Sequence, residues 1–411
     1  MNRLFIYPLL SLSIFSLNCS GMPKTEPILV AKTDTTIAPV ETREPNSPQY
    51  KAAFVGQTRT KGVKTTSKYT FKVLTEKLNS PWGLTSLPDG QLLITEKSGN
   101  LRIVKPTGEM SDKITGLPTV DTDGQGGLLG ITLDPAFSQN RLVYWAFSEP
   151  VSGGNHTSVA KGRLSDDERK IENPVVIYRA TPAHRGNLHY GGRVLFDKNG
   201  YLFVSTGERS DRSTRPQAQQ LNSGLGKIIR ITTDGKPAPG NTLASAGGSR
   251  PELYSYGHRN VQGLTINPVD GELWSNEFGP RGGDEINHVI PGKNYGWPTI
   301  TYGIEYGGGK IGDGIQQKDG LEQPVYYWDP SVSPSGMTFY SGSQIPEWQN
   351  NLFVGCLSGM HINRLVIKDN KVIGEERLLT EEYQRFRDVH QGKDGSLYAV
   401  TDQGRLYKIG K

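Results

Sequence analysis

Cysteine is nearly absent from this sequence. Its 411 residues include two cysteines, Cys19 near the start and Cys356 within the apolar run LFVGCL. One cysteine in the main body can form neither a disulfide framework nor a cysteine-rich metal site. Cys356 is therefore predicted to be a buried, unreactive thiol, because free cysteine in an apolar run packs as a small hydrophobic residue.

Two kinds of binding sequence are also missing. No basic run interleaved with aromatic residues occurs, and the net charge of +5 is small for this length, so nucleic acid is not expected as a partner. No glycine-rich dinucleotide fingerprint on a βαβ unit is visible either, so a nicotinamide cofactor is not expected.

Long apolar runs are missing as well. The segment from Leu4 to Leu17 is almost wholly apolar, but it is too short for a stable transmembrane anchor. With Arg3 before it and small or polar residues after it, residues 1–18 are predicted to be a signal peptide. Cys19 follows directly and resembles the lipidated cysteine of a bacterial lipoprotein, with plain secretion as the alternative. We expect an exported protein, periplasmic or anchored in the outer membrane through its lipid alone.

Residues 19–66 contain many threonines, prolines and lysines but few large apolar side chains. Such a segment cannot bury a core of its own. It is predicted to be a disordered tether between the membrane and a body that begins at residue 67.

The body contains a phrase that recurs six times, and each copy joins an apolar pair, a turn and a strand. The copies are GLTSLPDGQLLITEKSGNLRIV, GLLGITLDPAFSQNRLVYWAF, RVLFDKNGYLFVSTGE, GLTINPVDGELWSNEFGP, GMTFYSGSQIPEWQNNLFVGCL and VHQGKDGSLYAVTDQGRLYKI. An Asp-Gly or Asn-Gly pair in four of them indicates tight hairpins. Six such repeats predict that residues 67–411 form an all-β, six-bladed β-propeller. A β-sandwich or two β domains are the alternatives.

Polar residues gather in a few loops beside these strands. His189 has the side chain that most often accepts a proton at neutral pH, and Glu208 could orient it; a purely structural histidine is the alternative. Arg385 and Arg387 would share one face of a strand and repel each other unless anionic groups lie between them. A salt-bridged pair using Asp388 or Glu381 is the other reading.

The stretch 256–298 carries the densest polar run of the chain. Within it, the Gly279-Pro280 pair offers backbone carbonyls to a hard cation, and Asp284 and Glu285 add oxygen ligands. A solvated acidic loop is the alternative.

Six motifs in order resemble those of the soluble glucose and aldose sugar dehydrogenases that depend on pyrroloquinoline quinone (PQQ), the glucose/sorbosone dehydrogenase-like family. They extend from about residue 79 to the C-terminus and read DGQGGLLG, LHYGGRV, GHRNVQGL, NEFGPRGGDEIN, NYGWP and RFRDV. The resemblance implies a six-bladed propeller, in agreement with the repeat count. It also implies oxidation of aldoses at the anomeric carbon to lactones, with PQQ and Ca²⁺ as cofactors and an electron acceptor that the sequence does not identify.

The resemblance also implies residue roles. His189 would be the general base that takes the proton of the anomeric hydroxyl, and Arg259 would polarise the quinone. Trp328 lies in a segment that resembles a substrate-facing one. The implied cofactor contacts are Gln125, Arg259, Asn260, Tyr306, Ser331, Arg385 and Arg387. The implied Ca²⁺ ligands are the carbonyls of Gly279 and Pro280 for the ion that chelates PQQ, and Glu285 and Tyr295 for a second, structural ion.

Two positions depart from the glucose-oxidising members of the family. Glu208 stands where they have an aspartate near the base, and Ser358 stands where they have a cofactor-binding lysine. Losing that cation should weaken PQQ binding by about 1–3 kcal/mol if the contact is a charged hydrogen bond. The sequence therefore favours a broad aldose dehydrogenase. A propeller that binds sugar or protein without PQQ, and a Ca²⁺-dependent propeller lactonase, are the alternatives.

Overall fold

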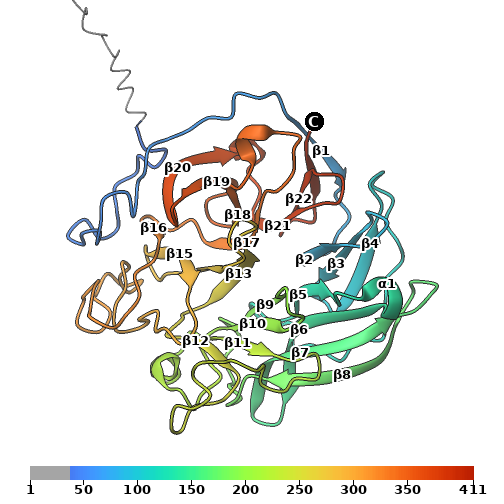
Figure 1. Ribbon diagram of the computed structural model, residues 1–411, viewed down its shortest axis with the longest axis horizontal. Helices are drawn as coiled ribbons and strands as arrows, with labels where there is room; N and C mark the ends of the chain where they lie inside the picture. The colour runs from blue at the N-terminus through green and yellow to red at the C-terminus, as the bar shows by residue number, and fades with distance from the viewer. Residues whose placement is uncertain (1–37) are drawn as a thin grey trace, which may run out of the picture. The chain divides into compact units, whose positions relative to one another are not determined.

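The computed structural model describes residues 38–411. These residues form six β-sheets, which Figure 1 shows arranged as blades around a common centre. The predicted six-bladed β-propeller is therefore confirmed. The predicted signal peptide and Cys19 lie outside the described residues.

The first three blades take up the chain from residue 81 to residue 256. Their strands are β2 (Pro81–Ser86), β3 (Leu92–Glu96) and β4 (Asn100–Val104); β5 (Leu128–Leu133), β6 (Leu142–Val151), β7 (Gly154–Leu164) and β8 (Ile171–Arg179); and β9 (Gly191–Phe196), β10 (Leu202–Thr206), β11 (Lys227–Ile231) and β12 (Leu253–Tyr256). Neighbouring strands within each blade are antiparallel.

The remaining three blades complete the ring. Their strands are β13 (Val261–Ile266), β14 (Leu273–Glu277), β15 (Asp284–Val289) and β16 (Tyr326–Trp328); β17 (Pro334–Phe339), β18 (Leu352–Cys356), β19 (His361–Lys368) and β20 (Lys371–Leu378); and β21 (Phe386–Gln391), β22 (Leu397–Thr401) and β23 (Leu406–Gly410) with β1 (Thr70–Thr75). Among the described residues, helices are short: α1 (Phe137–Asn140) and the 3-10 turns η1 (Arg215–Gln219), η2 (Pro346–Trp348) and η3 (Thr380–Glu382).

The ring closes through the two ends of the propeller. Strand β1 pairs antiparallel with β23, with Phe71 opposite Ile409, so the first strand completes the last blade; Figure 1 shows β1, in blue, beside the red C-terminal strands. The first strands of successive blades, β2, β5, β9, β13, β17 and β21, each contact the next around the centre. Closure leaves no exposed sheet edge between the first and last blades.

The six sequence repeats coincide with the inner strands of the blades. The first covers β2 to β4, and its Asp89-Gly90 pair forms the turn between β2 and β3, where the Gly90 amide donates to the Leu87 carbonyl at 3.0 Å. Gly90 has φ +89, a conformation that glycine adopts without steric cost. The hairpin signal in the sequence thus located the strands correctly.

Apolar side chains fill the spaces within and between blades. The largest fully buried side chains include Trp145, Trp274 and Trp348, and Trp348 packs against Tyr340 and Phe353. Each such aromatic removes a large apolar area from water, which is the main favourable contribution to folding. Cys356 is fully buried as predicted, and burial raises the pKa of its thiol. Within residues 38–411, no helix has the length and apolar character needed to span a membrane.

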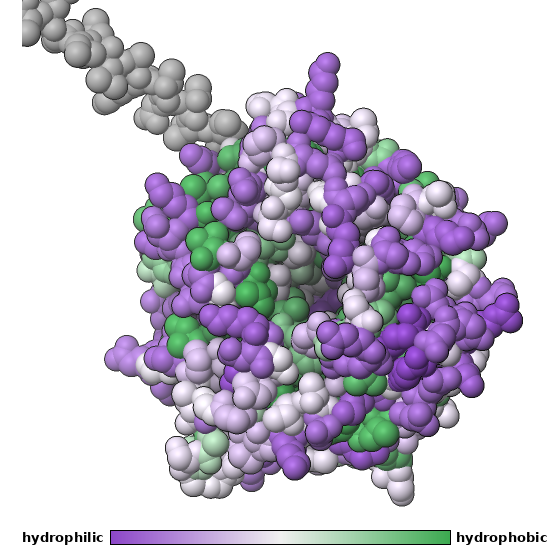
Figure 2. Space-filling model, turned by 45° about the vertical axis from the view of Figure 1, so that its right-hand side comes forward, coloured by the Kyte–Doolittle hydropathy of each residue, from purple (hydrophilic) through white to green (hydrophobic). Residues whose placement is uncertain are grey.

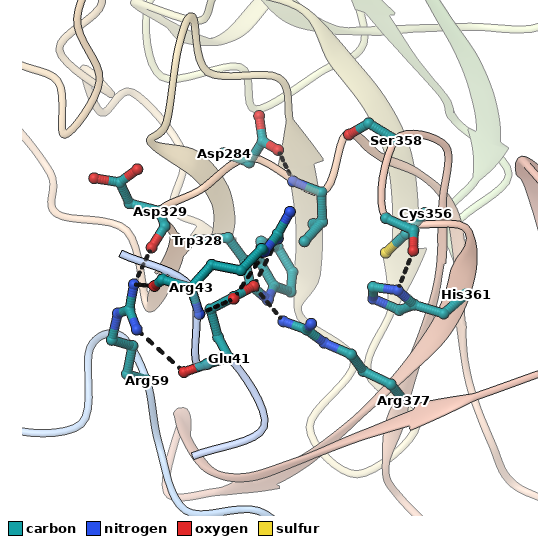
Figure 3. Close-up of polar contacts among 12 residues, drawn as sticks. Glu41, Arg43, Arg59, Asp284, Trp328, Asp329, Cys356, Ser358, His361 and Arg377 are labelled. Carbon is teal, nitrogen blue, oxygen red and sulfur yellow. Dashed lines mark hydrogen bonds and ion pairs between the residues drawn. The ribbon is translucent and has the colours of Figure 1, made fainter. Parts of the chain in front are cut away.

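Residues 38–66 differ from the tether predicted for residues 19–66: they form a segment, here called the N-terminal strap, that packs on the propeller. Arg59 donates to the carbonyls of Glu41, Arg43 and Asp329, as Figure 3 shows. The Asp329 carboxylate in turn accepts from the strap amides of Asn46 and Ser47 at 2.8 and 2.9 Å.

Polar contacts therefore hold the strap, including a parallel bridge from Gly62 to Glu375 in β20. Gln57 is fully buried and donates to the Pro324 carbonyl at 2.9 Å. The prediction failed because it looked for apolar side chains, whereas hydrogen bonds to blade loops anchor this segment. The structure does not describe residues 19–37 of the predicted tether.

Candidate active site

All six blades contribute residues to one cavity of about 460 Å³. The face of the molecule in Figure 2 is hollowed near its middle, where hydrophilic, neutral and hydrophobic residues border the hollow. The predicted site residues that line this cavity are Gln125, His189, Tyr306, Arg385 and Arg387. Other lining residues include Trp82, Lys97, Gln262, Ser333 and Asp402.

His189 and Glu208 form a buried pair at the wall of this cavity. The ring Nδ1 of His189 lies 2.6 Å from Oε1 of Glu208, and the two residues are 4% and 1% exposed. Burial lowers the pKa of His189 to about 4, and the positive charge of Arg259 acts in the same direction, against the pull of Glu208. With Nδ1 donating to the carboxylate, Nε2 of a neutral ring is left as the proton acceptor.

The backbone around His189 is held in an uncommon conformation. His189 has φ +47, and its amide donates to the side-chain oxygen of Gln125 at 2.9 Å. Arg209 donates to the carbonyls of Leu188 at 3.0 Å and Gly186 at 2.6 Å. Arg209 had no predicted role, and its position next to Glu208 in the sequence was the available signal.

Arg259 and Asn260 lie where the third and fourth blades meet. The Arg259 guanidinium donates to the Gly279 carbonyl at 2.7 Å, and the Asn260 side-chain oxygen accepts from the Gly191 amide at 2.9 Å. Among residues 38–411, Nε of Arg259 and Nδ2 of Asn260 are buried donors without an acceptor. Buried donors of this kind are costly unless something accepts from them, so the pair suits a ligand with carbonyl or carboxylate oxygens.

Hydrogen bonds to the Asp284 carboxylate hold the Gly279-Pro280 turn in place. This carboxylate accepts from the amides of Gly279 at 2.8 Å and of Val332 and Ser333 at 2.7 Å each. Figure 3 shows Asp284 with one of these hydrogen bonds as a dashed line. Burial raises the pKa of Asp284 to about 6, against these three hydrogen bonds. Asp284 is thus a brace within the turn, and not a carboxylate on a solvated loop.

The carbonyls of this turn are already in use as acceptors. Gly279 accepts from Arg259, and Pro280 accepts from the hydroxyl of Ser331 at 3.4 Å. Each carbonyl oxygen keeps a second lone pair for a cation. No cluster of three or more histidine, cysteine or acidic side chains that could hold a metal occurs within the described part of the chain, so a cation here would depend on backbone oxygens.

A second pair of acidic residues, Glu277 and Glu285, lies on the adjacent strands β14 and β15. Glu285 in β15 is paired across the sheet with Glu277 in β14. Burial and the charge of Glu277 raise the pKa of Glu285 well above its usual value. The phenol of Tyr295 donates to the His288 carbonyl at 2.6 Å and accepts from the Ile290 amide at 2.8 Å. Its hydroxyl is therefore occupied, and a cation at this place would use the backbone carbonyl oxygen of Tyr295.

Arg385 and Arg387 converge on the carboxylate of Asp402. Their Nε atoms lie 2.9 and 2.8 Å from its two oxygens. Burial alone would raise the pKa of Asp402, but the two arginines hold it below the usual value. The partner proposed from sequence, Asp388, instead pairs with Arg193 at 2.7 Å, so both the Asp388 and the Glu381 readings are corrected to Asp402. The terminal guanidinium nitrogens of Arg385 have no acceptor among residues 38–411.

The predicted site residues that do not line this cavity are Glu208, Arg259, Asn260, Gly279, Pro280, Glu285, Tyr295, Trp328 and Ser331. Trp328 is 2% exposed and belongs to the apolar core of the fourth and fifth blades, where its indole nitrogen donates to Glu375 at 3.2 Å. It does not line the cavity, so the structure does not support its predicted contact with substrate. Ser331 contacts the Pro280 turn and accepts from the Gly282 amide at 3.0 Å, while Tyr306 is 69% exposed at the cavity.

Comparison with known proteins gives consistent matches. Residues 78–408 match the model of a family described as glucose/sorbosone dehydrogenase. The aldose sugar dehydrogenase YliI of Escherichia coli K12 is 43% identical over 343 residues, which cover 82% of this chain and 92% of that protein.

Solved structures with the same fold agree with these matches. A crystal structure of the soluble aldose sugar dehydrogenase from Escherichia coli in the apo form is 42% identical, with a TM-score of 0.79, covering 84% of this chain and 99% of that one. A PQQ-bound aldose sugar dehydrogenase from Streptomyces coelicolor is 32% identical, with a TM-score of 0.69, and covers 84% of this chain and 99% of its own.

Proposed function

Since this chain belongs to the glucose/sorbosone dehydrogenase family of PQQ-dependent oxidoreductases, we propose that it oxidises aldoses at the anomeric carbon to lactones with PQQ and Ca²⁺. In this reaction the sugar loses two electrons and two protons. The bonds that break are the C–H bond at C1 and the O–H bond of the hydroxyl on C1. The observation that carries the proposal is the buried His189–Glu208 pair beside a cavity that also holds Arg385 and Arg387.

His189 is the residue that removes the hydroxyl proton of the sugar. Its Nδ1 is held by Glu208, so Nε2 accepts the proton and the imidazolium that forms is stabilised by the carboxylate. Glu208 here has the same charge as the aspartate of the glucose-oxidising members, with a longer side chain. The short 2.6 Å contact to Nδ1 supports equivalence of the two.

The residues present fit the implied cofactor. Arg259 and Asn260 provide buried, unsatisfied donors among the described residues, and Arg385 keeps free guanidinium nitrogens beside Asp402. These groups would hold the oxygens of PQQ, and the carbonyls of Gly279 and Pro280 would hold Ca²⁺. When bound, PQQ supplies the hydride acceptor and Ca²⁺ polarises it as a Lewis acid.

The test is reconstitution of the purified apo-protein. PQQ and CaCl₂ are added, binding is followed by the PQQ absorbance, and dye reduction is measured with a panel of aldoses. We expect turnover with several aldoses and none without PQQ. A protein that neither binds PQQ nor oxidises any sugar would refute the proposal and favour a binding propeller.

The matched control is His189→Gln in the same assay. Glutamine keeps a polar side chain beside Glu208 but cannot accept a proton at neutral pH. We expect PQQ to remain bound while turnover falls by about 10²–10⁴, the usual contribution of a general base. An unchanged rate would remove His189 as the base.

We also propose that the protein is exported and anchored through a lipid on Cys19, with the signal peptide at residues 1–18. The signal-like layout of the sequence supports this. Membrane fractionation of cells that express wild-type protein or Cys19→Ser tests it. A wild-type protein found wholly in the soluble fraction would contradict lipid anchoring.

A further inference from the structure

Lys97 reaches into the same cavity from the first blade. It follows β3 directly, and its Nζ donates to the carbonyl of Gly124 at 2.9 Å. It lines the cavity together with Arg385, Arg387 and Asp402. Neither the sequence motifs nor the comparisons give this lysine a role.

The cavity wall has an excess of positive charge. Burial lowers the pKa of Lys97, and the nearby charge of Arg387 acts in the same direction while Asp402 opposes it. The charged residues lining the cavity are three cations, Lys97, Arg385 and Arg387, and one carboxylate, Asp402, with His189 neutral near pH 7. Three positive charges against one negative charge leave two uncompensated. Such an excess suits a ligand that carries carboxylates.

Ser358, at the position of the family lysine, supplies no charge to this cavity. Its hydroxyl is 2.8 Å from the hydroxyl of Ser333, and Ser333 itself lines the cavity. Figure 3 shows Ser358 on the loop that follows β18, the strand that ends at Cys356. Lys97 and Ser333, the hydrogen-bond partner of Ser358, therefore line one cavity from different blades.

We propose that Lys97 binds a carboxylate of the cofactor and provides the positive charge that Ser358 lacks. This inference rests on the proposed function, because it concerns the cofactor that the function requires. The ammonium of Lys97 uses one donor on Gly124 and keeps two more for the ligand. Arg385 and Arg387 bind a second anionic group, and Asp402 holds these two arginines in place.

A structural role for Lys97 is the competing explanation. Its contact with Gly124 lies next to Gln125, whose side chain accepts from the His189 amide. A neutral residue at position 97 could therefore disturb the base through this loop without any loss of a cofactor contact. If Lys97 binds the cofactor, the Kd for PQQ depends on the charge at position 97 and on salt. If its role is structural, the Kd for PQQ depends on neither.

The experiment is a titration of the apo-protein with PQQ in the presence of Ca²⁺, followed by quenching of tryptophan fluorescence. We expect Lys97→Gln to raise the Kd for PQQ about tenfold or more, as for the loss of a charged hydrogen bond, and to reduce the dependence of Kd on salt. Lys97→Arg should stay close to wild type. Lys105→Gln, which removes an exposed lysine of the same blade, should change nothing.

Rescue from a different blade separates the effect of charge from that of structure. In the Lys97→Gln background, Ser358→Lys should recover most of the lost affinity, because it returns a cation to the cavity. A Kd for Lys97→Gln within twofold of wild type, or no recovery by Ser358→Lys, would overturn the inference. If the wild-type protein itself fails to bind PQQ, the proposed function fails instead, so the two failures are distinguishable.

Discussion

His189 should stay neutral at pH values where an ordinary histidine is protonated. Burial, with help from Arg259, lowers its pKa from 6.5 to about 4 in the folded chain. At pH 5 a group of pKa 4 is about 90% neutral, whereas one of pKa 6.5 is about 3% neutral. The base would therefore be available across a much wider acidic range than its residue type suggests.

The direct assay is NMR titration of the histidine rings in apo-protein, with His189→Gln to assign the signal. We expect a midpoint near pH 4. A midpoint at pH 6 or above would show that burial does not lower the pKa of His189 as described. In the reconstituted enzyme, kcat/KM should correspondingly keep most of its value at pH 5, provided that PQQ absorbance shows the cofactor still bound.

The same shift has a consequence for stability. A histidine whose pKa is lower in the folded than in the unfolded state stabilises the fold above pH 6.5, and this contribution is lost as the pH falls through about 4. A lowering from 6.5 to about 4 corresponds to about 3 kcal/mol. The free energy of unfolding in urea should therefore fall more steeply between pH 6.5 and 4 in wild type than in His189→Gln. Parallel curves for the two proteins would contradict the shift.

Two further substitutions test elements outside the His189–Glu208 pair. Arg209→Lys removes the guanidinium that donates to the Gly186 and Leu188 carbonyls. We expect kcat to fall about a hundredfold, as for a misplaced base, with the Kd for PQQ unchanged. An unchanged kcat would show that the loop does not need Arg209. Arg59→Met removes one hydrogen bond from the strap to the Asp329 carbonyl and two within the strap, to the carbonyls of Glu41 and Arg43. We expect a loss of about 1–3 kcal/mol in urea unfolding and faster proteolysis within residues 38–66. Equal stability of the two proteins would mean that these contacts contribute nothing.

Local sequence signals predicted the propeller well. Hairpins such as Asp89-Gly90 join strands that are adjacent in the chain, so turn chemistry and alternation locate them without knowledge of the rest. Trp328 shows the limit of this reasoning, because a tryptophan in a site-like segment can face either side of its strand. In β16 it faces the core and Glu375, and that choice depends on the neighbouring blade.

By itself, the sequence determined the blade count, named a candidate base and listed the charges available to an anionic ligand, because repeats and residue types are local properties. The tertiary structure alone decided which charges meet. Asp402 joins Arg385 and Arg387, Lys97 shares their cavity, and the strap reaches Asp329. Asp402 meets the two arginines through the pairing of β21 with β22 inside one blade, whereas Lys97 reaches them because the ring brings loops of different blades to one cavity. No local pattern in the sequence encodes these distances.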